Sequence, residues 1–316
     1  MTTLSSHEKK SVNAVVVTCN RISLLKECVE ALLCQTYKLK HIVIINNNST
    51  DGTSDWLDTL QSNPLFYIVN LKENIGGAGG FSLGVKDSTL LGCDYSWLMD
   101  DDTIPTPTAL ENLLTVTNQY DNIGFLGSHV NWTDGKAHQM NKCGIVKNKE
   151  GNDCKHIIGD YTVYEAQHAS FVSVLVSSIA VYKVGLPIKE FFIWCDDIEY
   201  SQRIYNSGFQ CFYVPSSIVV HKSQTNYFPS VDKAPVSMAW RFFYQARNTS
   251  FLKRKKTHFL PLFYLSILNK YRLYMRDLKK RKDGHRKEFR DSVRRGCIAG
   301  LSFNPQIEYV EKPISD

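Results

Sequence analysis

Apolar and polar residues alternate in blocks along the N-terminal third of the chain, and the blocks predict strands separated by helices. Four short apolar runs, rich in β-branched or aromatic residues, predict buried strands at 12–17, 41–45, 66–69 and 95–99. After the first run, apolar residues recur at helical spacing from Ile22 to Leu33, and a short helix is expected from Thr53. Strand–helix–strand repetition implies a mostly parallel sheet with helices on both faces, so we predict an α/β fold.

The remaining chain shows weaker periodicity until its C-terminal region. Residues 124–165 are rich in Gly, Asn and Lys and predict loops and short strands above a site. A β-rich run over 167–182, a helix over 196–206 and a short strand over 218–220 are expected next. Prolines within 226–236 predict a domain boundary there, after which the sequence becomes helical and basic.

Each of the four predicted strands is followed by a polar cluster. The clusters are Thr18-Cys19-Asn20-Arg21, Asn46-Asn47-Asn48-Ser49, Asn74-Ile75-Gly76-Gly77 and Asp100-Asp101-Asp102. In open α/β sheets, ligands bind beyond the carboxyl ends of the strands. We therefore expect the four segments to converge on one ligand site at that edge.

The three consecutive carboxylates Asp100, Asp101 and Asp102 suggest a metal site. In an extended segment Asp100 and Asp102 point to the same side, so both can address one ion. Mg²⁺ and Mn²⁺ prefer carboxylate oxygens together with substrate phosphates. The alternative is a solvated acidic turn that caps a helix near Thr106.

A second group of carboxylates, Asp196, Asp197 and Glu199, follows an apolar run, and Arg203 lies four residues after Glu199. A carboxylate at a helix start against an apolar wall can serve as a general base. Alternatively, these charges favour the helix macrodipole. His221 ends a short apolar strand and becomes a ligand candidate because a carboxylate metal site is already proposed.

The glycine run Gly76-Gly77-Ala78-Gly79-Gly80 allows a close approach of backbone to a ligand. It has neither the spacing of a dinucleotide-binding fingerprint nor the Lys-Ser/Thr of a P-loop. A tight turn with close helix packing is the alternative.

The cysteine content indicates the cellular compartment, and the distribution of charge indicates a basic surface. The chain has 316 residues and a net charge of +6, but residues 253–295 hold 16 basic and 4 acidic side chains, a net +12, leaving −6 elsewhere. Nine cysteines without CxxC spacing argue against a zinc site or a disulfide framework and fit a reducing cytosol. Neither a secretory signal nor an apolar run long enough to span a membrane is evident, so we expect a cytoplasmic protein.

The basic segment encloses the apolar stretch HFLPLFYLSIL at 258–268, about half of the ~20 residues that a span requires. Basic residues around an apolar aromatic segment are typical of peripheral binding to an anionic membrane, here its cytoplasmic face. The alternative is that two helices of this segment pack on the rest of the protein, with their charged side chains in water. We expect no nucleic-acid binding, because base-stacking and motif signals are missing.

Six motifs in order carry a resemblance to a known family. They are VVVTCNR (15–21), NNNSTDGT (46–53), ENIGGAGGF (73–81), WLMDDDT (97–103), FFIWCDDIEYSQR (191–203) and VVHKS (219–223). Over residues 12–225 the chain resembles glycosyltransferase family 2, whose members are inverting, metal-dependent GT-A enzymes that use nucleotide-diphospho-sugars. The glycine segment and the two acidic motifs most resemble bacterial galactofuranosyltransferases.

The resemblance implies a division of the chain. Residues 1–235 would form the GT-A catalytic domain, with a nucleotide-binding half at 12–103 and an acceptor half at 104–225. Residues 236–316 would form a basic helical region.

The resemblance also assigns roles to residues. It implies donor binding by Thr18, Asn20, Arg21, Asn46, Asp51, Asn74, Gly76, Gly77, Asp100 and Asp101. It implies metal binding, by Mn²⁺ or Mg²⁺, at Asp100, Asp102 and His221. Asp197 would be the catalytic base, and Trp194, Asp196 and Glu199 would contact or support the acceptor. Two positions depart from the pattern: Asn46 replaces a common Asp, and Cys195 separates Trp194 from the carboxylates.

The function implied is transfer of galactofuranose from UDP-galactofuranose to a growing bacterial surface polysaccharide of the O-antigen or capsule type, on an acceptor that we expect to be lipid-linked. A rhamnosyltransferase that uses dTDP-rhamnose is one alternative. A non-catalytic sugar-nucleotide-binding subunit of a glycan assembly complex is another.

Overall fold

The computed structural model describes residues 9–257 and 259–311. The first eight residues, on which the expected absence of a signal partly rests, and His258 of the apolar stretch lie outside the described residues.

The strands, in chain order, are β1 (Val12–Thr18), β2 (His41–Asn46), β3 (Phe66–Asn70), β4 (Tyr95–Asp100), β5 (Thr103–Pro105), β6 (Ile123–Asn131), β7 (Gly144–Ile145), β8 (Lys155–Ile158), β9 (Tyr161–His168), β10 (Val174–Ser177) and β11 (Gln210–His221). The α-helices are α1 (Ile22–Leu33), α2 (Thr53–Asp58), α3 (Gly76–Leu90), α4 (Ala109–Thr117), α5 (Ser178–Val184), α6 (Asp196–Asn206), α7 (Arg241–Lys256), α8 (Leu260–Leu278) and α9 (Arg286–Gly300). Two short 3₁₀ helices, η1 (Lys189–Phe191) and η2 (Val236–Met238), precede α6 and α7.

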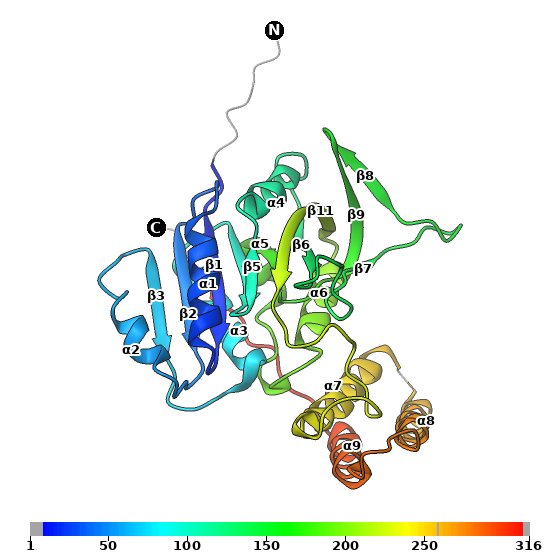
Figure 1. The fold of residues 1–316 in the computed structure, drawn as a ribbon. Coiled ribbons are helices and arrows are strands. Elements are labelled where there is room, and N and C mark those ends of the chain that lie inside the picture. Colours follow the sequence, from blue (N-terminus) through cyan, green and yellow to red (C-terminus); the bar gives the residue numbers. More distant parts are fainter. Residues whose placement is uncertain (1–8, 258, 312–316) are drawn as a thin grey trace.

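One mixed sheet organises the body, with strand order β3-β2-β1-β4-β10-β6-β11-β9-β7. The first four strands in the chain are mutually parallel, as predicted, and β10 inserts antiparallel between β4 and β6. Strand β5 pairs with the end of β11, while β8 and β9 form a hairpin that projects from the body (Figure 1).

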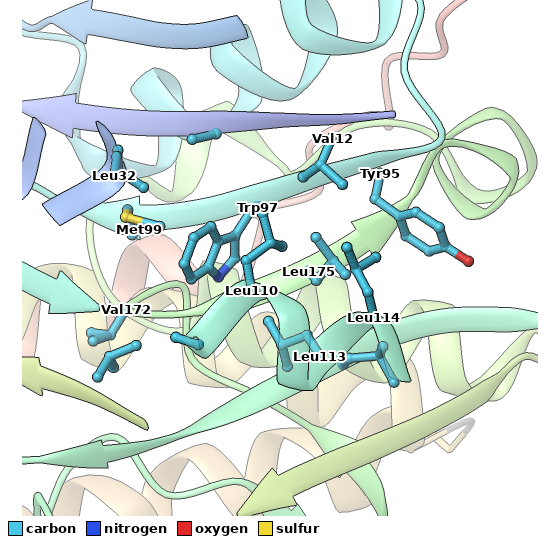
Figure 2. Packing of buried hydrophobic residues seen from close by; sticks show 14 of the residues in the cluster. Val12, Leu32, Tyr95, Trp97, Met99, Leu110, Leu113, Leu114, Val172 and Leu175 are labelled. Carbon is cyan, nitrogen blue, oxygen red and sulfur yellow. The ribbon is translucent and has the colours of Figure 1, made fainter. Parts of the chain in front are cut away.

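The sheet is covered on both faces because alternate residues of β1 enter different cores. Val12 and Val16 pack in a core with residues of α1, α2 and α4, whereas Val15 and Val17 pack in one with residues of α3, α5 and α6. Figure 2 shows the first core around Trp97, whose indole nitrogen donates a 3.0 Å hydrogen bond to the Ser173 hydroxyl. Two-sided burial is what a continuous apolar strand predicts.

The glycine run does not form the tight turn that was the alternative interpretation of the sequence. It forms the first turns of α3. A Cβ on Gly80 would lie 2.6 Å from Val17 Cγ1, and one on Gly84 would lie 2.4 Å from Val15 Cγ1. The glycines therefore let the helix lie directly on β1.

Three further expectations need correction. The run over 167–182 ends as α5 from Ser178, because the Ser177 hydroxyl caps that helix by accepting a 3.1 Å bond from the Ala180 amide. The region after 124 contains the nine-residue strand β6 rather than only short strands. The strand expected at 218–220 begins at Gln210. Its pairing with β6 shifts register between Val214 and Ile218, and this irregularity interrupts the alternation of residues that would have indicated one long strand.

The C-terminal helices have a core of their own that includes Phe242, Phe263 and Phe289. A smaller cluster joins them to the body, in which Phe251 of α7 meets Ala78 of α3 and Phe191 of η1. The segment after α9 then runs back to the body (Figure 1). Its Glu308 forms ion pairs with Lys86 and Lys189, at 2.7 and 3.2 Å.

Candidate active site

The acidic edge of the sheet is formed by β4, β5 and β11. Strand β4 ends at Asp100, and β5 pairs with the end of β11 so that Thr103 lies opposite His221. This pairing brings Asp100, Asp102 and His221 together, each with one ligand atom within 4.8 Å of the others. The three residues predicted to bind a metal therefore form a cluster, although they come from distant parts of the sequence.

The hydrogen bonds around this cluster leave a place for a cation. The His221 Nδ1 atom lies 2.9 Å from Asn141 Oδ1, which can only accept, so Nδ1 carries the proton. The other ring nitrogen lies 3.0 Å from Asp102 Oδ1, and that buried oxygen has no hydrogen-bond partner among the described residues. A neutral imidazole would place two acceptors face to face, so either a proton or a metal ion must lie between them. Asn141 is a positioning residue that the sequence patterns did not reveal.

The pKa shifts of the three side chains are also those expected of a cation-binding site. Burial raises the pKa of Asp100 to about 7, and the neighbouring Asp102 adds to the shift. Burial opposes ionisation of Asp102 and His221 as well, but their mutual attraction outweighs it, so the pKa of Asp102 is lowered and that of His221 is raised. The cluster is a set of desolvated carboxylates that a bound cation would stabilise.

Asp101 has a different role, tying the ends of β1 and β4 together. It accepts a 2.8 Å hydrogen bond from the Thr18 hydroxyl and a 3.2 Å bond from Arg21, which also contacts Asp102 at 2.6 Å. Burial raises the pKa of Asp101 to about 6, against the attraction of Arg21. Thr18 and Arg21, predicted to bind the donor, thus lie directly against the acidic edge.

The other predicted donor residues build loops around the same edge. Asn20 Oδ1 accepts a 2.6 Å bond from the Thr50 amide, and Asp51 Oδ2 accepts a 3.0 Å bond from the Ile22 amide. Asn74 Oδ1 accepts a 2.8 Å bond from the Gly76 amide at the start of α3. The first two contacts join the loops after β1 and β2, and the Asn74 side-chain amide nitrogen, 3.4 Å from Cys19 Sγ, joins the segment after β3 to them, as the convergence of polar clusters predicted.

Two neighbouring asparagines at the end of β2 are buried. The Asn46 amide group donates to Ser54 at 2.9 Å and to Asn70 at 2.8 Å, and its oxygen accepts from the Ser49 amide at 3.2 Å. A nucleobase could donate a hydrogen bond to the remaining lone pair of that oxygen. Asn47, which the sequence did not single out, bridges the start of α3 by accepting from the Ile75 amide at 2.8 Å and donating to the Gly76 carbonyl at 3.0 Å.

The predicted general base lies at the start of α6, beside the acidic edge. Asp196 and Asp197 are the first residues of the helix, after Cys195 in the left-handed conformation. Burial raises the pKa of Asp196 to about 8, and the charges of Asp197 and Asp100 contribute. Burial also raises the pKa of Asp197, against a 2.7 Å hydrogen bond from the Ile198 amide. Asp196 is near enough to the Asp100–Asp102–His221 group to be affected by the charge of Asp100, and Asp197 follows it directly. A carboxylate of raised pKa in such a position has the properties of a general base.

The segment before these carboxylates is strained and held from both sides. Phe192, Trp194 and Cys195 all have positive φ angles, of 64°, 65° and 70°. From α7, the buried Asn248 amide nitrogen lies 3.0, 3.1 and 2.9 Å from the carbonyl oxygens of Phe191, Ile193 and Trp194. Strain of this kind gathers at functional sites and persists only where the surroundings enforce it.

On the opposite side, the first turn of α3 contacts the Phe192 carbonyl, which accepts a 3.1 Å bond from the Ala78 amide. Gly76 has φ +77°, and a Cβ there would lie 2.2 Å from the Phe192 oxygen. The glycine motif and the acidic motif of α6 are therefore in backbone contact, and Asn248 completes the clamp.

Two predicted acceptor residues are engaged in packing. The Trp194 ring lies edge-on to Phe242 with 5.4 Å between ring centroids. The Glu199 carboxylate is buried and paired with Arg203 at 3.0 Å, the expected i,i+4 pair, and with Lys255 at 2.8 Å. These contacts favour a supporting role for Glu199 and a packing role for Trp194, and acceptor contact by either residue stays a prediction.

Comparisons with known proteins agree with the resemblance. The profile of "Glycosyl transferase family 2" matches residues 14–167. Galactofuranosyltransferase GlfT1 of Mycolicibacterium smegmatis is 30% identical over 204 residues, which cover 62% of this chain and 66% of that protein. The domain at residues 14–167 belongs to glycosyltransferase family 2. This family predicts glycosyltransferase activity for the protein. The chain spans 66% of the length of the relative that it matches.

Solved structures show the same fold. GalNAc-T7 with UDP, GalNAc and Mn²⁺ has a TM-score of 0.57 at 16% identity and covers 77% of this chain and 51% of its own. Mannosyltransferase PcManGT from Pyrobaculum calidifontis, in complex with GDP-Man and Mn²⁺, has a TM-score of 0.56 at 13% identity and covers 94% and 88%. The predicted GT-A fold is thus confirmed, with a helical C-terminal region.

Proposed function

We propose that the protein is an inverting, metal-dependent glycosyltransferase that transfers galactofuranose from UDP-galactofuranose to a growing bacterial surface glycan. The observation that carries the proposal is the placement of the Asp100–Asp102–His221 cluster next to Asp196 and Asp197 on one sheet edge. The named activity of the M. smegmatis relative supports the choice of donor sugar.

The side chains present fit a divalent cation. Asp102 Oδ1 is a buried acceptor that faces only the His221 ring nitrogen, at 3.0 Å, and two carboxylates and an imidazole form a donor set suited to Mn²⁺. Mg²⁺ prefers oxygen ligands, so the imidazole favours Mn²⁺ over Mg²⁺. When bound, the cation would neutralise charge on the leaving diphosphate.

The chain's own residues supply the rest of the reaction. Asp197 would accept the proton of an acceptor hydroxyl as that oxygen attacks the anomeric carbon, and its raised pKa makes it a stronger base than an exposed carboxylate. Asp196 would hold the acceptor or the donor sugar, and Arg21 would leave Asp101 and Asp102 in part to contact the diphosphate. One direct displacement, in which the bond from the anomeric carbon to the diphosphate oxygen breaks as the bond to the acceptor oxygen forms, inverts the configuration and releases the nucleoside diphosphate. Because a bound cation would stabilise that leaving group, a second catalytic acid is not required.

The test is a donor panel with Mn²⁺, in the presence and absence of EDTA: UDP-galactofuranose, UDP-galactopyranose, UDP-glucose and dTDP-rhamnose. We expect metal-dependent turnover that is selective for UDP-galactofuranose. Selective turnover of dTDP-rhamnose would keep the fold and reject the donor. Binding without turnover of any donor would favour the non-catalytic subunit.

The role of Asp197 is tested with Asp197→Asn, which should bind UDP normally and lose transfer. Asp160→Asn, an exposed carboxylate in a turn, is the matched control and should retain both. Turnover by Asp197→Asn at the control rate would remove Asp197 from the mechanism, and Asp196→Asn would then be tested as the base.

A lipid-linked acceptor and a membrane contact form the second part of the proposal. Among the described residues, none of the helices combines the length and apolar character needed to cross a bilayer. The first turns of α8 nevertheless expose large apolar side chains, 46–61% accessible: Phe259, Leu260, Leu262, Tyr264, Leu265 and Leu268. The exposed Lys253 and Lys256 lie at the adjoining end of α7. An apolar surface beside cations fits an anionic membrane surface.

Not all of the basic segment is available for such a contact. Lys255 pairs with Glu199, and Arg281 is buried against Asp283 and two backbone carbonyls. We therefore place the contact at the tip formed by Lys253, Lys256 and residues 259–268. Leu262→Glu with Leu265→Glu should abolish flotation with anionic liposomes. Ile157→Glu, which changes an exposed isoleucine on β8, should leave flotation intact, and equal flotation of all variants would reject the tip as the contact.

A further inference from the structure

Arg241 is a cation at the active site that the motif comparison did not assign. It is the first residue of α7, and its guanidinium lies 5.4 Å from the ring centroid of Trp240 and 6.0 Å from that of Trp194. Burial lowers its pKa, and repulsion by Arg21 contributes. The two guanidinium groups therefore lie near enough for their charges to repel, and Arg21 contacts Asp101 and Asp102. The contact with Trp194, in the segment that leads into α6, places Arg241 beside the predicted catalytic carboxylates.

The polar atoms of Arg241 lack partners. Its Nε atom is buried and has no hydrogen bond, and no ion pair is found for the side chain in the part of the chain that the structure describes. Other partly or fully buried arginines differ. Arg203 binds Glu199, Arg247 binds the Phe191 carbonyl, and Arg281 binds Asp283.

An unpaired, desolvated guanidinium is costly, and a second cation beside it raises the cost. The aromatic rings hold the group by cation–π contact but do not satisfy its N–H donors. An anion with several oxygens and more than one negative charge would satisfy both arginines at once. A diphosphate has this chemistry, and guanidinium groups bind phosphate oxygens in a bidentate manner.

We infer that Arg241 binds the diphosphate of a substrate, together with Arg21. The inference rests on the proposed function, because it needs a diphosphate substrate at this edge. The position beside Arg21 and the acidic cluster favours the diphosphate of the sugar-nucleotide donor, and a lipid-linked acceptor is the other source of the same group. Helix α7 then supplies a residue of the binding site as well as the Asn248 clamp.

The experiment is calorimetric titration of the full chain with Mn²⁺ and three ligands: UDP, uridine and a short-chain prenyl diphosphate. Arg241→Met keeps the aliphatic stem and removes the charge, and Arg241→Lys keeps a charge without the planar fork. Arg276→Met is the matched control, since that arginine lies on α8 with its side chain 67% exposed. Unfolding temperatures of all variants show that each is folded.

We expect Arg241→Met to weaken UDP binding by about tenfold to a hundredfold and to leave uridine binding unchanged. Arg241→Lys should lose less, and Arg276→Met should match the unsubstituted protein. Weaker binding of prenyl diphosphate with unchanged UDP binding would support the inference with the acceptor as the source. Unchanged binding of both ligands by folded Arg241→Met would overturn it.

The same data separate this inference from the proposed function. If the unsubstituted protein does not bind UDP, the proposed donor fails, and the prenyl diphosphate titration alone decides the role of Arg241. If it binds UDP and Arg241→Met binds equally well, with no effect on prenyl diphosphate, the inference fails and the proposed donor stands.

Discussion

Gly76→Ala tests the backbone contact between the glycine motif and the acidic motif. A methyl group at this position meets two obstacles. Gly76 has φ +77°, a conformation in which a side chain costs roughly 1–2 kcal/mol, and the new Cβ would lie 2.2 Å from the Phe192 oxygen. The carbonyl must move to relieve that overlap, and overpacking of this kind costs about 1–3 kcal/mol. We therefore expect a loss of about 2–5 kcal/mol in the free energy of unfolding.

Two control substitutions separate the obstacles. Gly151 has φ +84° with no atom within 4 Å of a new Cβ, so Gly151→Ala should cost roughly 1–2 kcal/mol from conformation alone. Gly77 has neither a positive φ nor a close neighbour, so Gly77→Ala should stabilise α3 by roughly 0.5–1 kcal/mol.

Urea unfolding at 25 °C measures all three differences. A stability of Gly76→Ala equal to that of Gly151→Ala would show that α3 does not press on the Phe192 carbonyl. Transfer activity provides the second readout, because displacement of Phe192 also moves the segment that leads into Asp197. Gly76→Ala with normal stability and normal turnover would refute the clamp altogether.

Three other outcomes follow from the same structure. Asn248→Leu leaves carbonyl oxygens of the clamped segment without a donor, so we expect about 2–4 kcal/mol of destabilisation in urea, with reduced transfer from a residue that does not touch the substrate. Burial lowers the pKa of Lys270 in the folded protein to about 8, below its ordinary 10.5. At a pH between these two values, the unfolded chain therefore keeps a proton on Lys270 that the folded chain has lost. Lys270→Met should therefore stabilise the protein at pH 7, and the gain should shrink as pH rises from 8 to 10.5; a gain independent of pH would contradict this. Because burial raises the pKa of Asp197, the acid limb of the transfer rate should lie above the ordinary pKa of a carboxyl, and a limb at or below about 4 would argue for another base.

The parallel half of the sheet could be predicted because its signals are local. Strands β1, β2 and β4 are continuous apolar runs, and each ends in a polar cluster at the edge where ligands bind. The meeting of Asp100, Asp102 and His221 was predicted through the family resemblance, and the pairing of β5 with β11 explains it.

The contributions of the C-terminal helices could not be predicted from local patterns. Asn248 and Arg241 stand in a segment whose apolar residues show only weak helical periodicity, and only the docking of α7 brings them to the segment before α6 and to Arg21. The start of α3 was also hidden, because glycine disfavours helix and its packing on β1 overrides that preference. Asn248 and Arg241 both lie in the segment WRFFYQARN at 240–248, and nothing in the spacing of that segment indicates chemistry.

The pairing of β5 with β11 also bears on how the protein folds. Asp102 and His221 come from distant parts of the sequence, and β6, β10 and α6 lie between β5 and β11 along the chain. Contacts of such long range form slowly, because loop closure precedes any gain from pairing. A cation that binds these side chains has no preformed site in the unfolded chain and stabilises only the completed body. The appearance of metal affinity during refolding would therefore report the pairing of β5 with β11.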